Sequence, residues 1–417
     1  MNEPIVPMQN TVQQLDDNDP LAHKRNAFVL PENMIYLDGN SLGALTRRSS
    51  ERVQEVVRQQ WGQDLIGGWN LHDWINLPQL TGEKIAPLLG AKSGQVIVCD
   101  SISVNLFKLL TTALSMQPGR VRVLSEQGNF PTDLYMVQGV QTLLGEQRCE
   151  LRSVASEQLE QEFTEDVAVL LLTHVNFRSG HIHDMQRLTR LAHEKGILVI
   201  WDLAHSAGAV PLTLDLCKVD FAVGCGYKYL NGGPGAPAFI YAAEKHHSAV
   251  QQPLSGWMGH ANPFAFTEDY QPALGIKQFL TGTPSILALA ALDAALDVFA
   301  DVDMHQLRDK SITMTEVFLA LKDQHAELSE LQLISPMDSQ CRGSQLSFSH
   351  PQAYAICQAL ITKGVVPDFR APDIIRFGFA PLYLSFANIQ QAIEVLCSIM
   401  QEQSFLQSRF QQKRAVT

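Results

Sequence analysis

The sequence has few cysteines, no excess of basic charge and no long apolar run. The seven cysteines are scattered, odd in number and include no CxxC pair. This favours reduced thiols in a cytoplasm over a disulfide framework or a zinc site. The net charge of −12 argues against a nucleic-acid or anionic-membrane partner, because both favour a basic surface.

No segment has the pattern of a membrane helix or a secretory signal. The longest apolar stretch, residues 286–300, is interrupted by Asp293 and Asp297. It indicates an amphipathic helix rather than the run of about 18 apolar residues that a bilayer requires. The first 20 residues are polar and lack the apolar core of a signal peptide. The sequence therefore predicts a cytoplasmic enzyme or binding protein.

The length favours more than one domain. The 417 residues exceed one ordinary compact core, and 46% apolar with 18% charged residues is typical of a globular protein. We divide the chain into an N-terminal segment (1–80), a large domain (81–284) and a smaller C-terminal α+β domain (285–417) on which the N-terminal segment packs. Helices are expected in the C-terminal domain at residues 286–300, 309–325 and 388–404.

Between residues 90 and 280, short apolar runs alternate with helical periods. The runs predict buried strands at residues 121–124, 167–172, 197–201, 221–223 and 238–241, with helices at 104–116 and 184–195. Strand–helix–strand alternation predicts an α/β fold with a mostly parallel sheet covered by helices on both faces. Ligands of such sheets bind at the carboxyl ends of the strands.

Two charged residues follow successive predicted strands. Asp202 ends the strand in WDLAHSAG, and Lys228 follows the next strand in GYKYLNGGPG. Alone, Asp202 is explained by a turn cap and Lys228 by an ion pair. Together they match a pyridoxal-phosphate site, where a lysine amine forms a Schiff base and a carboxylate faces the pyridine nitrogen.

Two further segments could complete such a site. CDSISVNLFKLL places Ser103 and the first free amides at the start of a predicted helix, where a phosphate can bind; a plain N-cap at Ser103 is the alternative. GNFPTD supplies Phe130, which could stack on a cofactor ring, and Asp133. Without the other segments, GNFPTD would indicate an ordinary turn.

Five motifs in order together resemble the kynureninase family. They are YLDGNSLG (36–43), GNFPTD (128–133), WDLAHSAG (201–208), YKYLNGGPG (227–235) and IIRFGFAPLY (374–383), and the resemblance spans residues 34–386. It implies the aspartate-aminotransferase-like fold type I of pyridoxal-phosphate enzymes. It also implies hydrolysis of L-kynurenine to anthranilate and L-alanine in tryptophan catabolism.

The resemblance implies a role for each matching residue. Lys228 would carry the cofactor, and Asp202 with Asp133 nearby would face the pyridine nitrogen. Tyr227, beside Lys228 and the phosphate, is then the candidate proton donor. The other cofactor contacts that it implies are stacking by Phe130 beside Pro131 and Thr132, phosphate binding by Ile102, Ser103 and Tyr227, and rim positions at Thr173 and His205.

The resemblance further implies a shared active site and a substrate site. Trp257 and Thr283 would reach the cofactor from a neighbouring subunit, which implies a homodimer. Arg376 would bind the substrate α-carboxylate with the two-pronged geometry of a guanidinium, and Ser41, Trp69 and Gly282 would also contact the substrate. Some relatives have Ser-Asn in place of Gly282-Thr283; Gly-Thr resembles the bacterial type that favours kynurenine over 3-hydroxykynurenine.

Two alternative functions remain open at this point. A cysteine desulfurase or class-V-type aminotransferase would keep the cofactor, and a desulfurase would need a mobile catalytic cysteine, for which Cys341 is the candidate. A non-catalytic ligand-binding or regulatory protein would have lost the lysine or the aspartate. A metal site is not predicted, because His174, His181 and His183 have no acidic partner in evident register.

Overall fold

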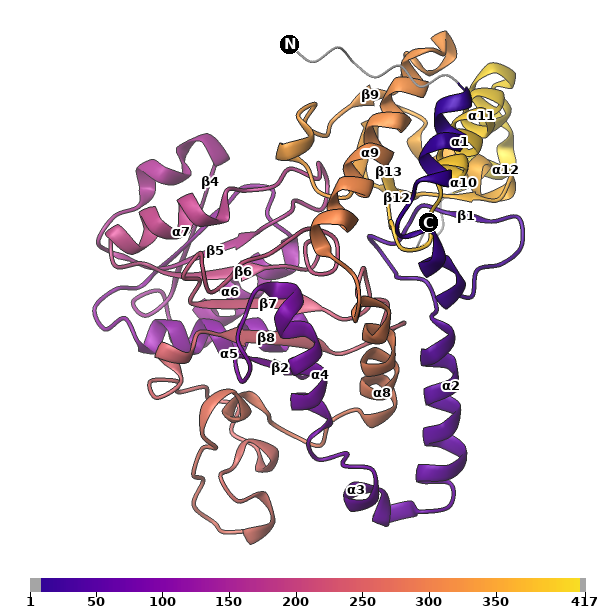
Figure 1. Ribbon diagram of the computed structural model, residues 1–417. Coiled ribbons are helices and arrows are strands. Elements are labelled where there is room, and N and C mark those ends of the chain that lie inside the picture. The colour runs from indigo at the N-terminus through magenta and orange to yellow at the C-terminus, as the bar shows by residue number, and fades with distance from the viewer. Residues whose placement is uncertain (1–8, 413–417) are drawn as a thin grey trace.

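The large domain is built on a seven-stranded sheet. The computed structural model describes residues 9–412. The strand order is β2-β8-β7-β6-β5-β3-β4, and β8 runs antiparallel to its neighbours β7 and β2 while the pairs from β7 to β4 are parallel (Figure 1). The strands are β2 (Val96–Val98), β3 (Arg122–Glu126), β4 (Glu150–Val154), β5 (Val167–Thr173), β6 (Leu198–Asp202), β7 (Phe221–Cys225) and β8 (Ala238–Ala242).

Both faces of this sheet are buried. In β5, Leu170 and Leu172 belong to one hydrophobic cluster, whereas Val169 and Leu171 belong to another. Because successive side chains of a strand point to opposite faces, the two clusters lie on the two sides of the sheet. The covering helices include α5 (Ile102–Ser115), α6 (Pro131–Leu144) and α7 (Met185–Glu194). The predicted α/β fold is confirmed.

The small domain contains a four-stranded antiparallel sheet of order β12-β13-β10-β9 (Figure 1, upper right). Its strands are β9 (Gln332–Leu333), β10 (Gln345–Ser349), β12 (Asp368–Arg370) and β13 (Ile374–Gly378), and its helices are α9 (Met304–Asp323), α10 (Ala353–Thr362), α11 (Phe386–Glu402) and α12 (Ser408–Gln411).

The N-terminal segment contacts both domains. Its strand β1 (Ile35–Tyr36) pairs in parallel with β11 (Val365–Val366) of the small domain, and α1 (Gln9–Asp17) packs on α11. Helices α2 (Arg47–Glu55), α3 (Gly68–Leu71) and α4 (Leu77–Ile85) follow, and α2 and α4 both pack on α8 (Ile286–Ala295). The contact with the large domain includes the Gly43 amide, which donates to the Tyr227 carbonyl at 2.7 Å. The division at residues 80 and 284 stays a prediction, and its outermost residues, 1–8 and 413–417, lie outside the described part of the chain.

Several elements differ from those predicted. The helix predicted at residues 286–300 is α-helical only to Ala295 and continues as a 3-10 turn at Leu296–Phe299. The helix predicted at 309–325 begins at Met304, where Asp303 caps it through a bond from the His305 amide. Strands β2 and β4 and helices α6 and α10 were not predicted. No helix within residues 9–412 has the length and apolar character needed to cross a membrane.

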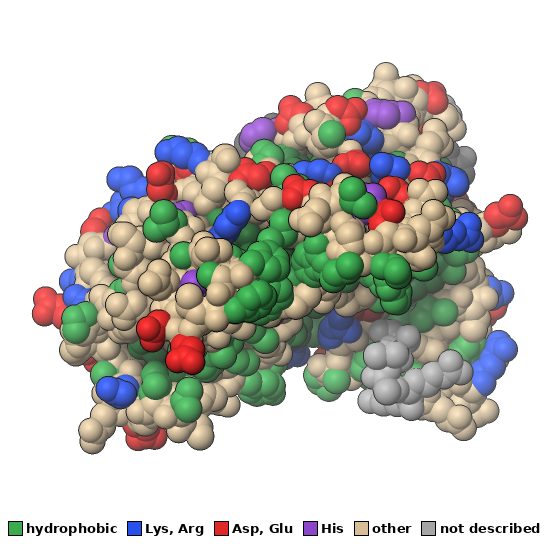
Figure 2. Space-filling view, turned by 90° about the horizontal axis from the view of Figure 1, so that it is seen from below, with side chains coloured by type: hydrophobic (Ala, Val, Ile, Leu, Met, Phe, Trp, Pro, Cys, Tyr) green, Lys and Arg blue, Asp and Glu red, His purple; other side chains and the backbone are tan. Residues whose placement is uncertain are grey.

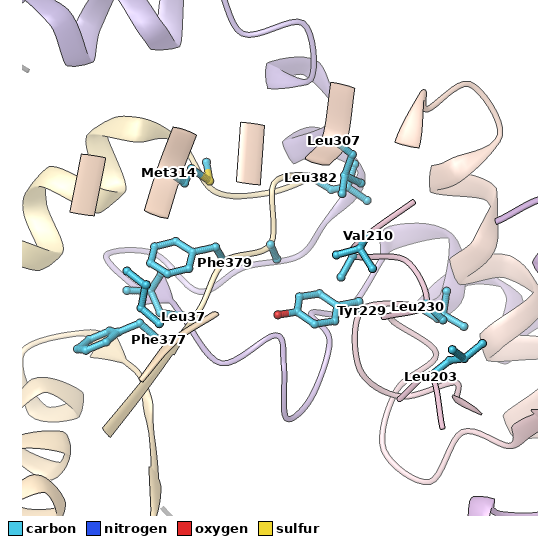
Figure 3. Packing of buried hydrophobic residues seen from close by; sticks show 14 of the residues in the cluster. Leu37, Leu203, Val210, Tyr229, Leu230, Leu307, Met314, Phe377, Phe379 and Leu382 are labelled. Atoms are coloured by element: carbon cyan, nitrogen blue, oxygen red, sulfur yellow. The ribbon is translucent and has the colours of Figure 1, made fainter. Parts of the chain in front are cut away.

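A continuous hydrophobic cluster joins the two domains (Figure 3). Tyr229 lies in it between Leu203 and Leu230 of the large domain and Phe377 of the small domain. Its hydroxyl donates to the Ser344 carbonyl at 2.9 Å. Since Tyr229 directly follows Lys228, this packing fixes the backbone that carries the lysine.

A buried carboxylate stabilises the end of the large sheet away from Asp202. Asp220, 1% exposed, accepts bonds of 2.7 Å from His193, His246 and Lys245. Burial alone would raise the pKa of Asp220, but these bonds hold it well below its ordinary value. This stability is present above the unfolded-state pKa of about 3.9 and is lost as the pH falls below it.

We therefore expect Asp220→Asn to lower the free energy of unfolding by about 1–3 kcal/mol at pH 7, since the substitution removes the buried charged acceptor that these three donors share. Urea unfolding between pH 7 and pH 3 would measure this. The difference between parent and variant should shrink below pH 4, and a difference independent of pH would contradict the assignment.

Candidate active site

A cavity of about 420 Å³ lies at the carboxyl ends of the large sheet's strands. Of the residues predicted for the site, nine line it: Ile102, Ser103, Phe130, Thr132, Thr173, Asp202, His205, Tyr227 and Lys228. They come from five separate segments of the sequence. The parallel strands bring these segments together, since their carboxyl ends meet at one edge.

Asp202 and Lys228 lie in the same cavity. β6 ends at Asp202 and its neighbour β7 ends at Cys225, three residues before Lys228. Lys228 is 9% exposed, and its Nζ lies 2.9 Å from Nε2 of His205. Burial, followed by the charge of Lys228, lowers the pKa of His205 well below its usual range, so the imidazole is neutral and can accept a hydrogen bond from the amine.

A second buried carboxylate lies beside Asp202. Thr173 is the direct strand partner of Asp202, and its hydroxyl donates to Asp133 Oδ2 at 3.2 Å. Asn129 donates to the same oxygen at 3.1 Å. Burial, and next the charge of Asp202, raises the pKa of Asp133 well above its ordinary value. Burial also raises the pKa of Asp202, to about 6, against the opposing charge of Lys228.

The first turn of α5 forms one wall of the cavity. Ser101, not Ser103, is the N-cap, since its side chain accepts from the Val104 amide at 3.4 Å. The N-cap explanation of Ser103 is therefore wrong. Ser103 lies in the first turn of the helix, where its hydroxyl lines the cavity beside Ile102. This leaves the hydroxyl available to a ligand, together with the free amides of the helix start.

GNFPTD is the start of a helix rather than an ordinary turn. Phe130 is the N-cap of α6 and Pro131 its first residue, an arrangement that suits proline because the first helical amide needs no partner. Thr132 and the ring of Phe130 line the cavity, whereas Pro131 is exposed and does not. Lys228 Nζ lies 5.9 Å from the centre of the Phe130 ring.

Arg376 and Ser41 lie in a buried polar network beside the cavity. Arg376 is 1% exposed, and its guanidinium binds the Asp368 carboxylate with two hydrogen bonds, Nε to Oδ1 at 2.7 Å and Nη2 to Oδ2. Nη2 also donates to the Ser41 hydroxyl at 3.1 Å. Nη1 donates to the backbone carbonyl of Phe177, a residue that lines the cavity.

Four predicted residues lie away from the cavity within this chain. Trp69 packs edge-on against Trp74, with ring centres 5.9 Å apart. Trp257, Gly282 and Thr283 are exposed, and none of them lines the cavity.

The sequence did not predict several residues around the site. Phe177 lines the cavity, and Arg370 donates to Asp368 at 2.8 Å and to Ser41 at 3.0 Å. A signal for Phe177 was available, since it follows β5 just as Lys228 follows β7. For Asp368 and Arg370 the signal was an acid and a base two residues apart, close to the IIRFGFAPLY motif.

The geometry gives little support to a catalytic cysteine or to a metal site. Cys341, the candidate for a desulfurase, does not line the cavity, and its thiol lies 3.6 Å from Asp338 Oδ2. Cys225 does line the cavity, but burial raises the pKa of its thiol and disfavours the reactive thiolate. Across residues 9–412, no group of three or more His, Cys, Asp or Glu side chains is placed to hold a metal ion.

Comparison with known proteins decides the family. The chain is 50% identical over 393 residues to the kynureninase of Deinococcus radiodurans, covering 93% of this chain and 95% of that protein. It is 47% identical to the kynureninase of Pseudomonas fluorescens, covering 98% and 99%. The chain belongs to the kynureninase family. A family model described as the kynureninase C-terminal domain also matches residues 307–396.

Solved structures with the same fold are more distant in sequence. The cysteine desulfurase of Thermococcus onnurineus superposes with a TM-score of 0.73 at 17% identity, covering 96% of this chain and 100% of that chain. CsdA, a cysteine desulfurase of Escherichia coli, gives 0.75 at 18% identity, covering 92% and 98%. At such identities the likeness supports the fold alone.

Proposed function

We infer that this protein hydrolyses L-kynurenine to anthranilate and L-alanine with pyridoxal phosphate as its cofactor. The observation that carries the proposal is that Lys228 and Asp202, the two residues such a cofactor requires, line one cavity in a chain of the kynureninase family. An absorbance scan with and without L-kynurenine tests it. We expect a cofactor band near the visible edge and blue fluorescence from anthranilate, whereas sulfide released from L-cysteine without anthranilate would favour a desulfurase.

The cavity fits the cofactor in the polar groups around it. Two buried polar atoms around it have no hydrogen-bond partner in the protein, Asp133 Oδ1 and His205 Nδ1. Buried polar atoms are rarely left unpaired, so these are places where a ligand supplies the partner. The proposed phosphate donors are Ser103 and the Ile102 amide at the start of α5, with Tyr227, which follows β7. Phe130 would stack on the ring, and Asp202, beside Asp133, would hold the proton of the ring nitrogen.

The protein's own residues supply proton transfer and orientation. Bound at Lys228, pyridoxal phosphate supplies an electron sink for the negative charge that develops on the substrate carbons. Lys228, once its amine is free, would remove the substrate α-proton, and His205, 2.9 Å away, would keep its Nζ in place. Water adds to the γ-carbonyl, and cleavage of the Cβ–Cγ bond gives anthranilate and, after protonation, L-alanine.

Tyr227 is the proposed proton donor for that last step. Burial, followed by the neighbouring Cys225 and Asp202, raises the pKa of its hydroxyl well above the ordinary value, so the hydroxyl keeps its proton. We expect Tyr227→Phe to lower kcat by about 10²–10⁴-fold while the cofactor band remains. Stopped-flow absorbance and anthranilate fluorescence would measure both. Turnover equal to that of the parent would remove Tyr227 from the scheme.

The α-carboxylate would bind Arg376, and the ring of the substrate would lie near Gly282 and Trp69. A Cβ added to Gly282 would meet no atom within 4 Å, so this position is open within one chain. We propose that kynurenine is preferred over 3-hydroxykynurenine. Comparing kcat/KM for the two substrates tests this preference.

The free cysteines of the described residues agree with a proposed cytoplasmic location.

We also propose a homodimer that completes each site with Trp257 and Thr283 of the other subunit. Exposed apolar side chains support it, notably Ile66 (82% exposed), Phe266 (77%) and Leu274 (92%). The segments that carry them lie at the lower end of the molecule in Figure 1, and Figure 2, seen from that end, shows hydrophobic side chains gathered there. Apolar surface of this kind marks an interface.

Co-expression of two inactive variants tests shared sites. In a mixed dimer of Lys228→Ala and Trp257→Ala subunits, one site has both native residues, so roughly a quarter of all sites regain activity at equal expression. A pair of Lys228→Ala and Arg376→Ala is the control, because both changes lie in the site of one chain and no native site can form. Activity no higher than that of the separate variants would contradict shared sites.

A further inference from the structure

One face of the small sheet carries a row of buried polar side chains, two of which donate to the backbone carbonyl of Phe177, a residue that lines the cavity. Arg376 in β13 lies directly opposite Asp368 in β12 and Ser347 in β10. Gln345 lies two residues before Ser347 in β10 and therefore shares its face. All four side chains are buried. The two-pronged bond to Asp368 fixes one edge of the Arg376 guanidinium, so only the edge formed by Nη1 and Nη2 is left for a substrate.

That edge is capped by the protein itself. Nη1 donates to the carbonyl of Phe177, and Nη2 donates to the Ser41 hydroxyl in addition to Asp368. A substrate carboxylate that binds both nitrogens must compete with the Phe177 carbonyl. The released carbonyl would then be a part-buried acceptor that has lost its charged donor, which costs free energy unless a second donor is present.

Gln345 is that second donor. Its Nε2 lies 3.1 Å from the Phe177 carbonyl and 3.3 Å from the Ser347 hydroxyl. Asn40 donates to its Oε1 at 3.5 Å, which orients the amide. The backbone of the Phe177 segment lies against this side chain, since a Cβ on Gly180, at φ +73°, would lie 2.9 Å from Gln345 Cγ.

The same segment reaches the proposed cofactor site. The Phe177 ring packs edge-on against Phe130, with ring centres 5.2 Å apart. Asn176 donates to the Gly128 carbonyl at 3.0 Å, in the loop that leads to Phe130. Phe177 thus contacts Arg376 and Gln345 through its carbonyl and, through its ring, the Phe130 ring proposed to stack on the cofactor.

We propose that Gln345 is a positioning residue for the substrate α-carboxylate. Its amide keeps its hydrogen bond to the Phe177 carbonyl when Arg376 leaves that carbonyl to bind the carboxylate. The Phe177 ring then stays on Phe130 while the guanidinium changes partner. The inference rests on the proposed function, because it takes Arg376 as the carboxylate-binding residue.

The test compares two ligands that differ only in the carboxylate, L-alanine and ethylamine, each titrated into holoenzyme and followed by the change in cofactor absorbance. In Gln345→Met we expect L-alanine to bind about 10-fold more weakly, because its binding leaves a carbonyl unpaired. Ethylamine should change less than about 2-fold, since it does not displace the carbonyl. For L-kynurenine, KM should rise in the same proportion as the dissociation constant of L-alanine, with kcat retained.

Ser347→Ala is the matched control, because it removes the other partner of Gln345 Nε2 and leaves the bond to Phe177 intact; we expect both ligands to bind as in the parent. Equal weakening of both ligands, or no change in either, overturns the proposal. If Gln345→Met does not fold, Gln345→Asn, which retracts the amide by one methylene, carries the same test. The ligand comparison does not depend on kynurenine cleavage, so failure of the proposed function would be seen separately.

Discussion

Replacing Lys228 by alanine should abolish turnover, with a loss of more than about 10⁴-fold. The substitution removes the amine that would carry the cofactor and the base that would take the substrate α-proton. Lys228 is 9% exposed and its Nζ bonds His205, so no solvent group replaces it in position. Purified Lys228→Ala should keep no covalent label after borohydride reduction. Anthranilate fluorescence measures the residual activity.

Lys195→Ala is the control for this experiment, because Lys195 is an exposed residue at the end of α7, away from the cavity. Its turnover and its borohydride label should equal those of the parent. A Lys228→Ala protein that still carries the label, or that still cleaves L-kynurenine at the parent rate, would place the cofactor on another amine.

The second large effect is expected for Asp202→Asn, with kcat lowered by about 10³–10⁴-fold while the cofactor still binds. The neutral amide is isosteric and keeps the acceptor for the Ala204 amide, which donates to Asp202 Oδ1 at 2.9 Å. It has no negative charge to hold a proton on the ring nitrogen, so the ring loses its capacity to accept electrons. Stopped-flow absorbance should show cofactor binding with slow substrate chemistry.

Asp309→Asn provides the control, since Asp309 is exposed on α9 and the same isosteric change there leaves the cavity untouched. Parent-like kcat in Asp202→Asn would mean that Asp133, with its unpaired Oδ1, holds the ring proton instead.

The sequence predicted five of the seven strands of the large sheet because each contains an apolar run, whereas β4 (ELRSV) is largely polar and β2 has only three residues. β5 (Val167–Thr173) is buried at every position, and a continuous apolar run of this kind predicts a strand that is covered on both faces. Asp202 and Lys228 stand out for the same reason, since each interrupts or follows an apolar strand. A charge at the end of a buried strand is informative from sequence alone.

Other features depend on contacts that no local pattern contains. The bond between Gln345 and the Phe177 carbonyl joins residues 168 positions apart, and Gln345 has no neighbour in sequence that marks it as part of a site. The choice between Ser101 and Ser103 as N-cap depends on backbone angles at the helix start, which the Ser-Ile-Ser pattern does not fix. The start of α6 was recognisable, because Pro131 at the first helical position and Asp133 in the first turn are helix-start signals.

The cluster around Tyr229 limits how the protein can open. A rigid swing of one domain away from the other would pull the Tyr229 hydroxyl from the Ser344 carbonyl and expose the apolar side chains around it. It would also displace Lys228 from its position at the carboxyl ends of the strands. We therefore expect a ligand to enter without a swing of one domain away from the other.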